Sequence, residues 1–161
     1  MQDNSIPTSE PLMDMVIPLP KYKHVDKPTK EKISKTGKII KAQPRKEFQR
    51  IALINNLHKW FRFQKTEVKN NYKELLKDFY ISEPTRKYRS GEIEFIIHRD
   101  SKAKLDSDAI IFAVKWFTDS LVETGHLVDD DRITYILKPS IYTPNNAETQ
   151  LRVIVKLAEQ D

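Results

Sequence analysis

Six aspartates lie between positions 106 and 131; five of them form two groups at the ends of a largely apolar stretch, and Asp119 lies within it. Asp106 and Asp108 form an Asp-x-Asp pair at one end, and three consecutive aspartates, 129–131, stand at the other. Lys115 and Asp119 lie between the groups. At about 100° per residue of a helix, each falls within about 20° of Asp108. We therefore predict that Asp108, Lys115 and Asp119 form one polar line on a helix.

The charges of the chain are unevenly divided, and the division indicates an anionic partner. The net charge is +5, yet residues 20–50 hold 11 Lys and Arg against 3 Asp and Glu, whereas residues 106–161 hold 5 against 10. A polyanion attracted by the first stretch is repelled by the second unless the carboxylates hold a divalent cation. Carboxylates around a hard cation such as magnesium form a positive site facing a phosphate, an arrangement typical of enzymes that cleave phosphodiester bonds.

Each of these features also has a plain structural explanation. Asp106 and Asp108 beside Ser107 are favoured residues for capping a helix N-terminus. The aspartates at 129–131 suit a polar turn between a helix and a strand. The Lys-rich stretch can be a solvated linker. Its ring-bearing residues, Tyr22, His24 and Phe48, are too sparse in the sequence to predict a platform for stacking bases.

Hydrophobic spacing predicts an α/β fold, a mixed β-sheet packed with helices. Strands are expected at 15–19, 93–98, 132–137 and 151–157, and helices from 45 to about 61, at 69–79 and at 107–124, the last closed by Gly125. Residues 1–14 are expected to be a flexible tail and 21–44 a mobile arm or long loop. One domain should therefore span 15–161, with a basic arm at about 20–45.

The two longer helices are predicted from apolar residues at three- and four-residue spacing. In the first helix these residues are Phe48, Ile51, Ile54, Leu57 and Phe61. In the second, the residues expected to face the core are Ile110, Val114, Phe117 and Leu121. The apolar surface of the second helix is broadened by Ile111, Phe112, Trp116 and Val122. It exceeds what one core requires, so part of this helix is expected to pack against a partner subunit.

Composition excludes several other classes of site. The chain has no Cys, which excludes disulfides, a thiol nucleophile and cysteine-bound zinc or iron–sulfur clusters. The histidines, His24, His58, His98 and His126, show no metal-ligand spacing. Neither a run of 18 apolar residues nor a secretion signal is present, so we expect no membrane partner and a cytoplasmic protein.

The stretch from Leu105 through Ile133 resembles the RusA family of Holliday-junction resolvases, which are often carried by phages and prophages. The resemblance consists of the Asp-x-Asp pair, the step Lys115-x-x-x-Asp119-x-Leu121, then Gly125 and an Asp-Asp pair that begins four residues later. The order of strands and helices around this stretch is also similar. In the better-known members an Asn follows the second Asp and a lysine comes about one turn later. Here Ala109 follows, and Lys115 comes seven residues later.

The resemblance implies a homodimeric, magnesium-dependent endonuclease, with manganese as a substitute, that nicks four-way DNA junctions symmetrically in recombination and repair. It implies that Asp106, Asp108 and Asp130 bind the metal and that Lys115 completes the catalytic set. The basic arm is expected to contact DNA phosphates. Its candidate residues are Lys21, Lys23, Lys38, Lys41, Arg45, Lys46 and Arg50.

Three alternatives remain open at the level of the sequence. The first is a metal-dependent nuclease for other branched or flap DNA. The second is a non-catalytic DNA-binding phage accessory protein, in which Ala109 and the shifted lysine have spoiled the metal site. The third is a basic ribosomal or RNA-associated protein, which should prefer RNA to junction DNA.

Overall fold

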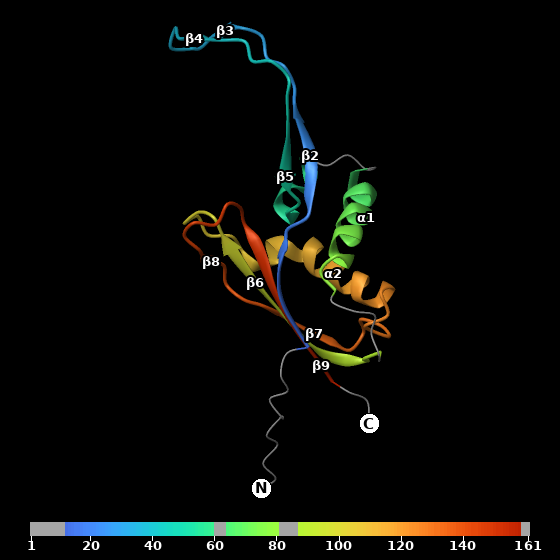
Figure 1. The fold of residues 1–161 in the computed structure, drawn as a ribbon. Coiled ribbons are helices and arrows are strands. Elements are labelled where there is room, and N and C mark those ends of the chain that lie inside the picture. The colour runs from blue at the N-terminus through green and yellow to red at the C-terminus, as the bar shows by residue number, and fades with distance from the viewer. Residues whose placement is uncertain (1–11, 60–63, 81–86, 159–161) are drawn as a thin grey trace.

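The computed structural model describes residues 12–59, 64–80 and 87–158. Its core is a five-stranded sheet of mixed direction, as predicted (Figure 1). In spatial order the path is β1 (Met13–Pro18), β9 (Gln150–Ala158), β6 (Ser90–Arg99) and β7 (Ile133–Leu137), and β8 (Ile141–Tyr142) pairs with the far end of β6. The β1/β9 and β9/β6 pairs are antiparallel, whereas β7 and β8 run parallel to β6.

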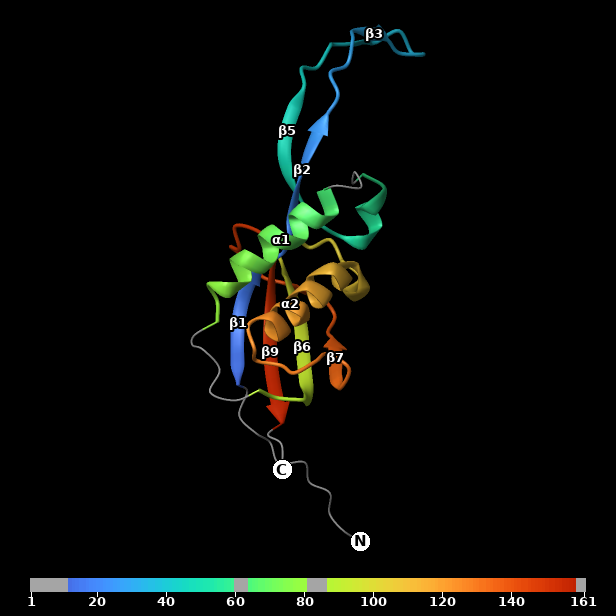
Figure 2. The same cartoon turned by 90° about the vertical axis from the view of Figure 1, so that its right-hand side faces the viewer.

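Side chains of the central strands alternate between a buried and a solvent-facing side. In β9, Leu151, Val153 and Val155 are buried, and the residues between them are more exposed. In register with these, Ile93 and Phe95 of β6 lie on the same side of the sheet. Figure 2 shows the two helices α1 (Gln64–Lys77) and α2 (Ile111–Glu123) lying across one face of this sheet. The sheet and both helices therefore enclose the core.

The predicted second long helix exists, with its first turn in a different form. A 3-10 turn, η2 (Ser107–Ile110), leads directly into α2, which ends just before Gly125. The residues predicted to face the core do so: Ile110, Val114, Phe117 and Leu121 are buried. Helix α2 follows β6 in the chain and leads to β7, which runs parallel to β6. The three elements therefore form a strand–helix–strand unit.

The extra apolar surface of α2 is mostly covered within the same chain. Trp116 is only 2% exposed and packs beside Tyr72 of α1, with ring centroids 6.3 Å apart. Phe112 stacks on Trp116, with centroids 5.3 Å apart, whereas Ile111 stays exposed. This surface is the one from which a partner subunit was predicted. Because α1 covers most of it, the surface no longer requires a second chain.

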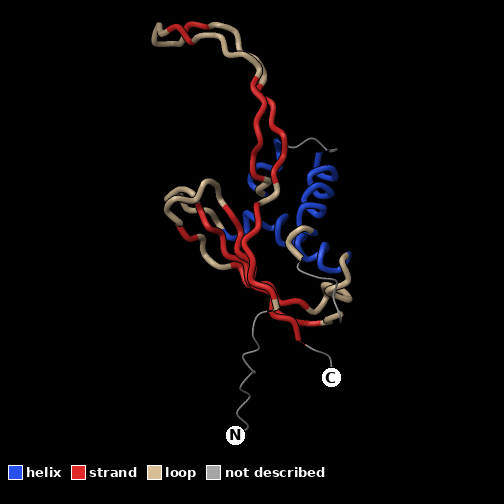
Figure 3. Tube along the Cα trace, viewed as in Figure 1, coloured by secondary structure: helices blue, strands red, loops and turns tan. Residues whose placement is uncertain are grey.

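The basic arm is a long β-hairpin, rather than a loop followed by a helix. Strands β2 (Lys21–Asp26) and β5 (Lys46–Ile51) pair antiparallel near the body, and β3 (Lys32–Ile33) and β4 (Ile39–Ile40) pair near the tip. Figures 1 and 3 show this ribbon projecting far from the sheet and helices. The predicted helix from residue 45 is therefore wrong: its first part is β5, and the 3-10 helix η1 (Ile54–Lys59) follows.

Other boundaries differ less from the prediction. Helix α1 begins five residues before the expected start at 69. Strand β1 begins at Met13, so Met13 and Asp14 belong to the sheet and not to the predicted tail. The rest of that tail, residues 1–11, lies outside the described residues, as does Phe61. Among the described helices, none has the length and hydrophobicity that a membrane span requires.

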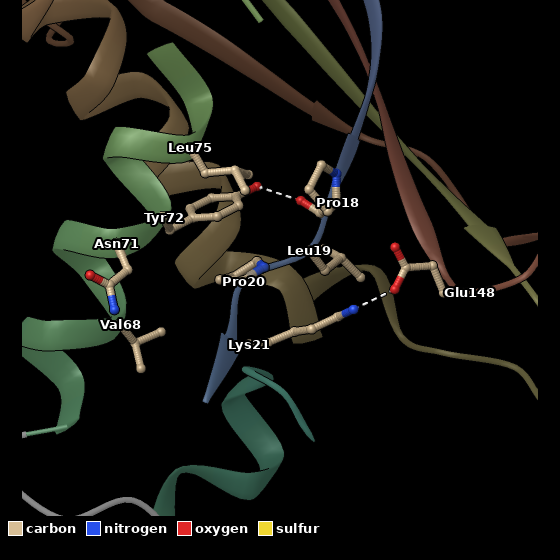
Figure 4. A pocket seen from close by; sticks show the side chains of 9 residues that line it. All are labelled: Pro18, Leu19, Pro20, Lys21, Val68, Asn71, Tyr72, Leu75 and Glu148. Carbon is tan, nitrogen blue, oxygen red and sulfur yellow. Dashed lines mark hydrogen bonds and ion pairs between the residues drawn. The ribbon is translucent and has the colours of Figure 1, made fainter. Parts of the chain in front are cut away.

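Hydrogen bonds join the base of the arm to α1 and join the two sides of the arm to each other. The Tyr72 hydroxyl donates to the Pro18 carbonyl oxygen at 3.0 Å, and the amide of Ala52 donates to the Pro20 carbonyl oxygen at 2.7 Å. A hollow of about 400 Å³ lies here, between α1 and the β1–β2 connection (Figure 4). At its edge Lys21 forms an ion pair with Glu148. These contacts fix the direction in which the arm leaves the body.

Candidate metal site and nucleic-acid surface

Asp106 and Asp108 stand exposed at the start of η2. Asp106 occupies the N-cap position, and its carbonyl oxygen accepts the amide of Ala109 at 3.0 Å. Its side chain, however, makes no capping hydrogen bond. Asp106 therefore stands at the capping position, but its carboxylate does not cap the helix. Neither carboxylate forms an ion pair or side-chain hydrogen bond with another described residue, so both are available to a ligand.

The second acidic group forms the turn before β7. The Asp129 carboxylate accepts the backbone amide of Asp130 at 2.7 Å, so the polar-turn explanation holds for Asp129. The Asp130 carbonyl oxygen in turn accepts the amide of Ile133, the first residue of β7, at 3.4 Å. Asp130 is half-buried, whereas Asp129 and Asp131 are exposed. Asp130 is therefore the more enclosed carboxylate of the three.

The structure does not gather Asp106, Asp108 and Asp130 into one cluster. The first two precede α2 and the third follows it, and a helix of 13 residues is about 20 Å long. Among the residues that the structure describes, no three His, Asp or Glu side chains are placed to share a metal ion. Magnesium often takes only one or two protein carboxylates and completes its shell with water and substrate phosphate, so Asp106 and Asp108 are the pair that could hold it.

Of the predicted polar line, Lys115 and Asp119 lie together on α2, whereas Asp108 lies in the 3-10 turn before it. Asp119 also contacts α1. The Lys115 Nζ lies 3.6 Å from Asp119 Oδ1. On the other side, Lys69 and Lys73 of α1 bring their Nζ atoms to 3.9 and 3.8 Å from Asp119 Oδ2. Lys73 also pairs with Glu123. These two lysines were not singled out from the sequence, although their spacing of four residues places them on one side of α1.

Tyr135 of β7 connects the middle of α2 with the second acidic group. Burial raises the pKa of its hydroxyl; the charges of Asp130 and Asp119 add to the rise, and that of Lys115 opposes it. The Tyr135 hydroxyl therefore lies within electrostatic reach of both Lys115 on α2 and Asp130 before β7. Sequence analysis missed Tyr135, whose only signal is its place in a strand.

The arm carries the predicted cationic residues, and some of them are already paired. Lys23 and Arg45 both contact Glu47, at 2.7 and 2.9 Å. The hydrogen bond from Lys23 and the charges of both partners lower the pKa of the Glu47 carboxyl. Lys21 pairs with Glu148, as described above. The residues that remain exposed without a described carboxylate partner are Lys38, Lys41 and Lys46.

Hairpin pairing also gathers aromatic residues that are distant in the sequence. His24 lies opposite Phe48, with ring centroids 5.2 Å apart, and the Arg50 guanidinium lies 4.8 Å from the centre of the Phe48 ring. Tyr22, 6.2 Å from His24, is buried. Cross-strand pairing thus brings these rings closer together than their spacing in the sequence indicates. Because Tyr22 is buried, the described arm still presents no row of exposed rings on which bases could stack. Of these rings, Phe48 is the most exposed, and it lies beside the Arg50 guanidinium.

A scan of protein-family models found no match for this chain, and a search of curated proteins found none either. The similarity to RusA resolvases therefore rests on the residues from Leu105 through Ile133 and on the order of the elements around them.

Proposed function

We propose that this protein binds branched DNA through its basic β-hairpin and acts on four-way junctions as a magnesium-dependent endonuclease of the RusA type. The observation that carries the proposal is the arm itself. It is a two-stranded ribbon, exposed along most of its length, with 11 Lys and Arg against 3 Asp and Glu in residues 20–50. The arm encloses no hydrophobic core of its own, so folding alone does not account for it. Its excess of positive charge favours binding to a polyanion.

The dimensions of the arm support duplex DNA as the partner. The major groove of B-DNA is about 12 Å wide and admits a two-stranded β-ribbon. Exposed lysines such as Lys38, Lys41 and Lys46 can contact phosphates from within or beside the groove. Lys23 and Arg45, which share Glu47, supply less net charge. Binding through such contacts weakens steeply as salt concentration rises.

The cleavage step is assigned to the face that carries the free carboxylates. Asp106 and Asp108 would hold magnesium together with DNA phosphate oxygens, and the ion would polarise the phosphate and acidify a bound water. Lys115, exposed on α2, would contact a neighbouring phosphate. The resemblance assigns Asp130 as a third metal ligand, a role that the separation along α2 does not favour in this conformation. We also propose that two copies act together in the cytoplasm, because paired symmetric nicks need two related sites.

A second candidate is a DNA-binding protein without nuclease activity. The observation that favours it is the separation of Asp130 from the Asp106–Asp108 pair, with Ala109 where the better-known resolvases have an Asn. Such a protein keeps the arm and its affinity for DNA. It forms no product in magnesium or manganese.

The decisive experiment incubates the full chain with a labelled four-way junction, a flap and a linear duplex, in magnesium and in EDTA. We expect paired nicks in the junction that need magnesium and disappear in Asp108→Asn while binding persists. Asp78→Asn, the same change of charge at an exposed position beyond α1, is the control and should cleave normally. Tight binding without nicks in either metal establishes the second candidate. Cleavage that prefers flaps assigns another branched substrate.

A separate competition tests the arm. Replacing residues 27–45 by Asn-Gly joins β2 directly to β5 at the Asp26–Lys46 pair and removes seven Lys and Arg and one Glu. We expect junction affinity to fall and its dependence on salt to flatten. Unchanged affinity would contradict a role of the arm in binding. Preferential displacement of the junction by duplex RNA would instead indicate an RNA-associated protein.

A further inference from the structure

We propose that Ile33 and Ile39, at the tip of the arm, form an apolar wedge that inserts between base pairs of the bound DNA. The inference rests on the proposed DNA binding and adds to it a second kind of contact. The lysines would hold the phosphates, and the wedge would unstack a base step. Neither the order of acidic residues nor the resemblance to resolvases suggests such a contact.

The two isoleucines are among the most exposed large apolar residues of the described chain, at 74% and 66%. They lie directly opposite each other in the β3–β4 pair, so their side chains project to the same side of the ribbon. Ile40 pairs with Lys32 and projects to the other side. The tip therefore presents two adjoining branched side chains to solvent on one side. Figure 3 shows that this end of the arm lies far from the sheet and the helices.

The turn at the tip holds its shape without these side chains. The Ser34 amide donates to the Lys38 carbonyl oxygen at 2.8 Å, and the Ser34 hydroxyl accepts the Lys38 amide at 3.0 Å. Gly37, with φ of 78°, donates its amide to the Ser34 carbonyl oxygen at 2.9 Å. A positive φ of this size suits glycine in a hairpin turn. Because backbone and Ser34 contacts define the turn, the isoleucines are not needed to form it.

The positive charge around the wedge favours nucleic acid as the partner into which it inserts. Between residues 30 and 41 the tip carries five lysines and one glutamate. Two of the lysines, Lys32 and Lys38, adjoin Ile33 and Ile39 in the sequence. DNA-bending proteins combine basic residues with apolar side chains such as isoleucine, which enter the minor groove and unstack a base step at a cost in stacking energy. That cost is smallest at flexible steps. A branch point, where stacking is already interrupted, is the natural place for the tip.

The test uses the full chain and junctions that carry 2-aminopurine at or away from the branch point. Unstacking raises the fluorescence of 2-aminopurine, so the parent protein should increase emission from a probe at the branch point. The double variant Ile33→Ser/Ile39→Ser should lose most of this increase and bind roughly tenfold more weakly at fixed salt. Because all lysines are kept, its salt dependence should stay unchanged. Ile40→Ser, on the other side of the tip, is the matched control and should behave as the parent.

Each other outcome overturns the wedge. Binding without a fluorescence increase, or an increase that persists in the double variant, would contradict the wedge. Either result would leave the proposals of DNA binding by the arm and of cleavage unaffected. No DNA binding by the parent removes both proposals. Isoleucine-dependent binding to vesicles of anionic lipid, or loss of a dimer in the double variant with DNA binding unchanged, assigns the tip to a membrane or to a second copy. Circular dichroism and thermal melting should show that both variants are folded.

Discussion

Lys73 of α1 and Asp119 of α2 face each other across the helix pair, with Nζ 3.8 Å from Oδ2, and Lys73 is only 7% exposed. The same ammonium group pairs with Glu123 one turn further along α2. Asp119 is thereby held by lysines from two helices. This acidic residue, which belongs to the resolvase-like pattern in the sequence, joins α1 to α2 in the structure.

Replacing Lys73 with Met should lower the free energy of unfolding by about 1–2 kcal/mol, because it leaves a partly buried Asp119 with fewer cations nearby. The loss stays moderate since Lys69 and Lys115 remain. Lys77→Met is the control: it lies on the same helix and breaks only an exposed pair with Glu74, which should cost about 0.5 kcal/mol or less. Urea unfolding measures both. Equal losses in the two variants would contradict the role of Lys73.

Substitutions of Asp119 and Asp108 should have different effects, the first on stability and the second on cleavage. Asp119→Asn removes the charge that three lysines share, so it should lower stability by about 1 kcal/mol and leave magnesium-dependent nicking of a junction in place. Asp108→Asn alters an exposed carboxylate without a described protein partner. It should abolish nicking and leave the urea midpoint unchanged. If Asp119→Asn loses cleavage while its fold is intact, Asp119 belongs to the catalytic set and the assignment changes.

Local sequence predicted the buried elements well. The strand over β6 and the strand over β9 were found because Ile93, Phe95 and Val153 lie in short apolar or alternating runs bounded by polar residues. Helix α2 was found because one face is apolar along its whole length. In these elements burial against the core and local pattern agree, and the pattern was sufficient.

The hairpin was missed because its pairing is not local. Phe48 and Ile51 fit a helical spacing as well as a strand, and residue 48 pairs with His24, which is 24 positions earlier. An exposed ribbon buries little, so neither strand shows a clear alternation. The candidate site shows the same limit. Types and spacing identified Asp106 and Asp108 as free carboxylates, but only the path of the chain shows that α2 separates them from Asp130 and that Asp119 contacts α1.

Gly91 should be intolerant of any side chain. A Cβ added there would lie 2.3 Å from the Lys156 carbonyl oxygen on β9, where the two strands pair. Backbone atoms at that distance must move, so Gly91→Ala should lower the free energy of unfolding by more than about 2 kcal/mol. Gly37→Ala is the control: φ is again positive, but nothing lies within 4 Å of the added Cβ. It should cost about 1 kcal/mol or less, confined to the arm. Thermal melting distinguishes the two, and similar losses would contradict the close approach at Gly91.

Alkaline pH should weaken the contact between α1 and the base of the arm through Tyr72. Burial raises the pKa of Tyr72 well above its ordinary value of 10. Burial also raises the pKa of the neighbouring Tyr80 to about 12, and the nearby Glu123 charge adds to the rise. Both groups hold their protons more tightly in the folded chain than in the unfolded chain. The stability that they contribute is therefore complete below about pH 10 and is lost as the pH rises toward 12.

Tyr72→Phe tests this dependence. At pH 7 the variant should be less stable by about 1 kcal/mol, because it loses the hydrogen bond to the Pro18 carbonyl oxygen. Between pH 9.5 and 11.5 its urea midpoint should fall less than that of the parent, since one tyrosine that resists ionisation is gone. The difference between the two proteins should therefore shrink or reverse. Tyr142→Phe, at an exposed position on β8, should follow the parent over the whole range. A constant difference between Tyr72→Phe and the parent would show that Tyr72 ionises as readily in the folded chain as in the unfolded one.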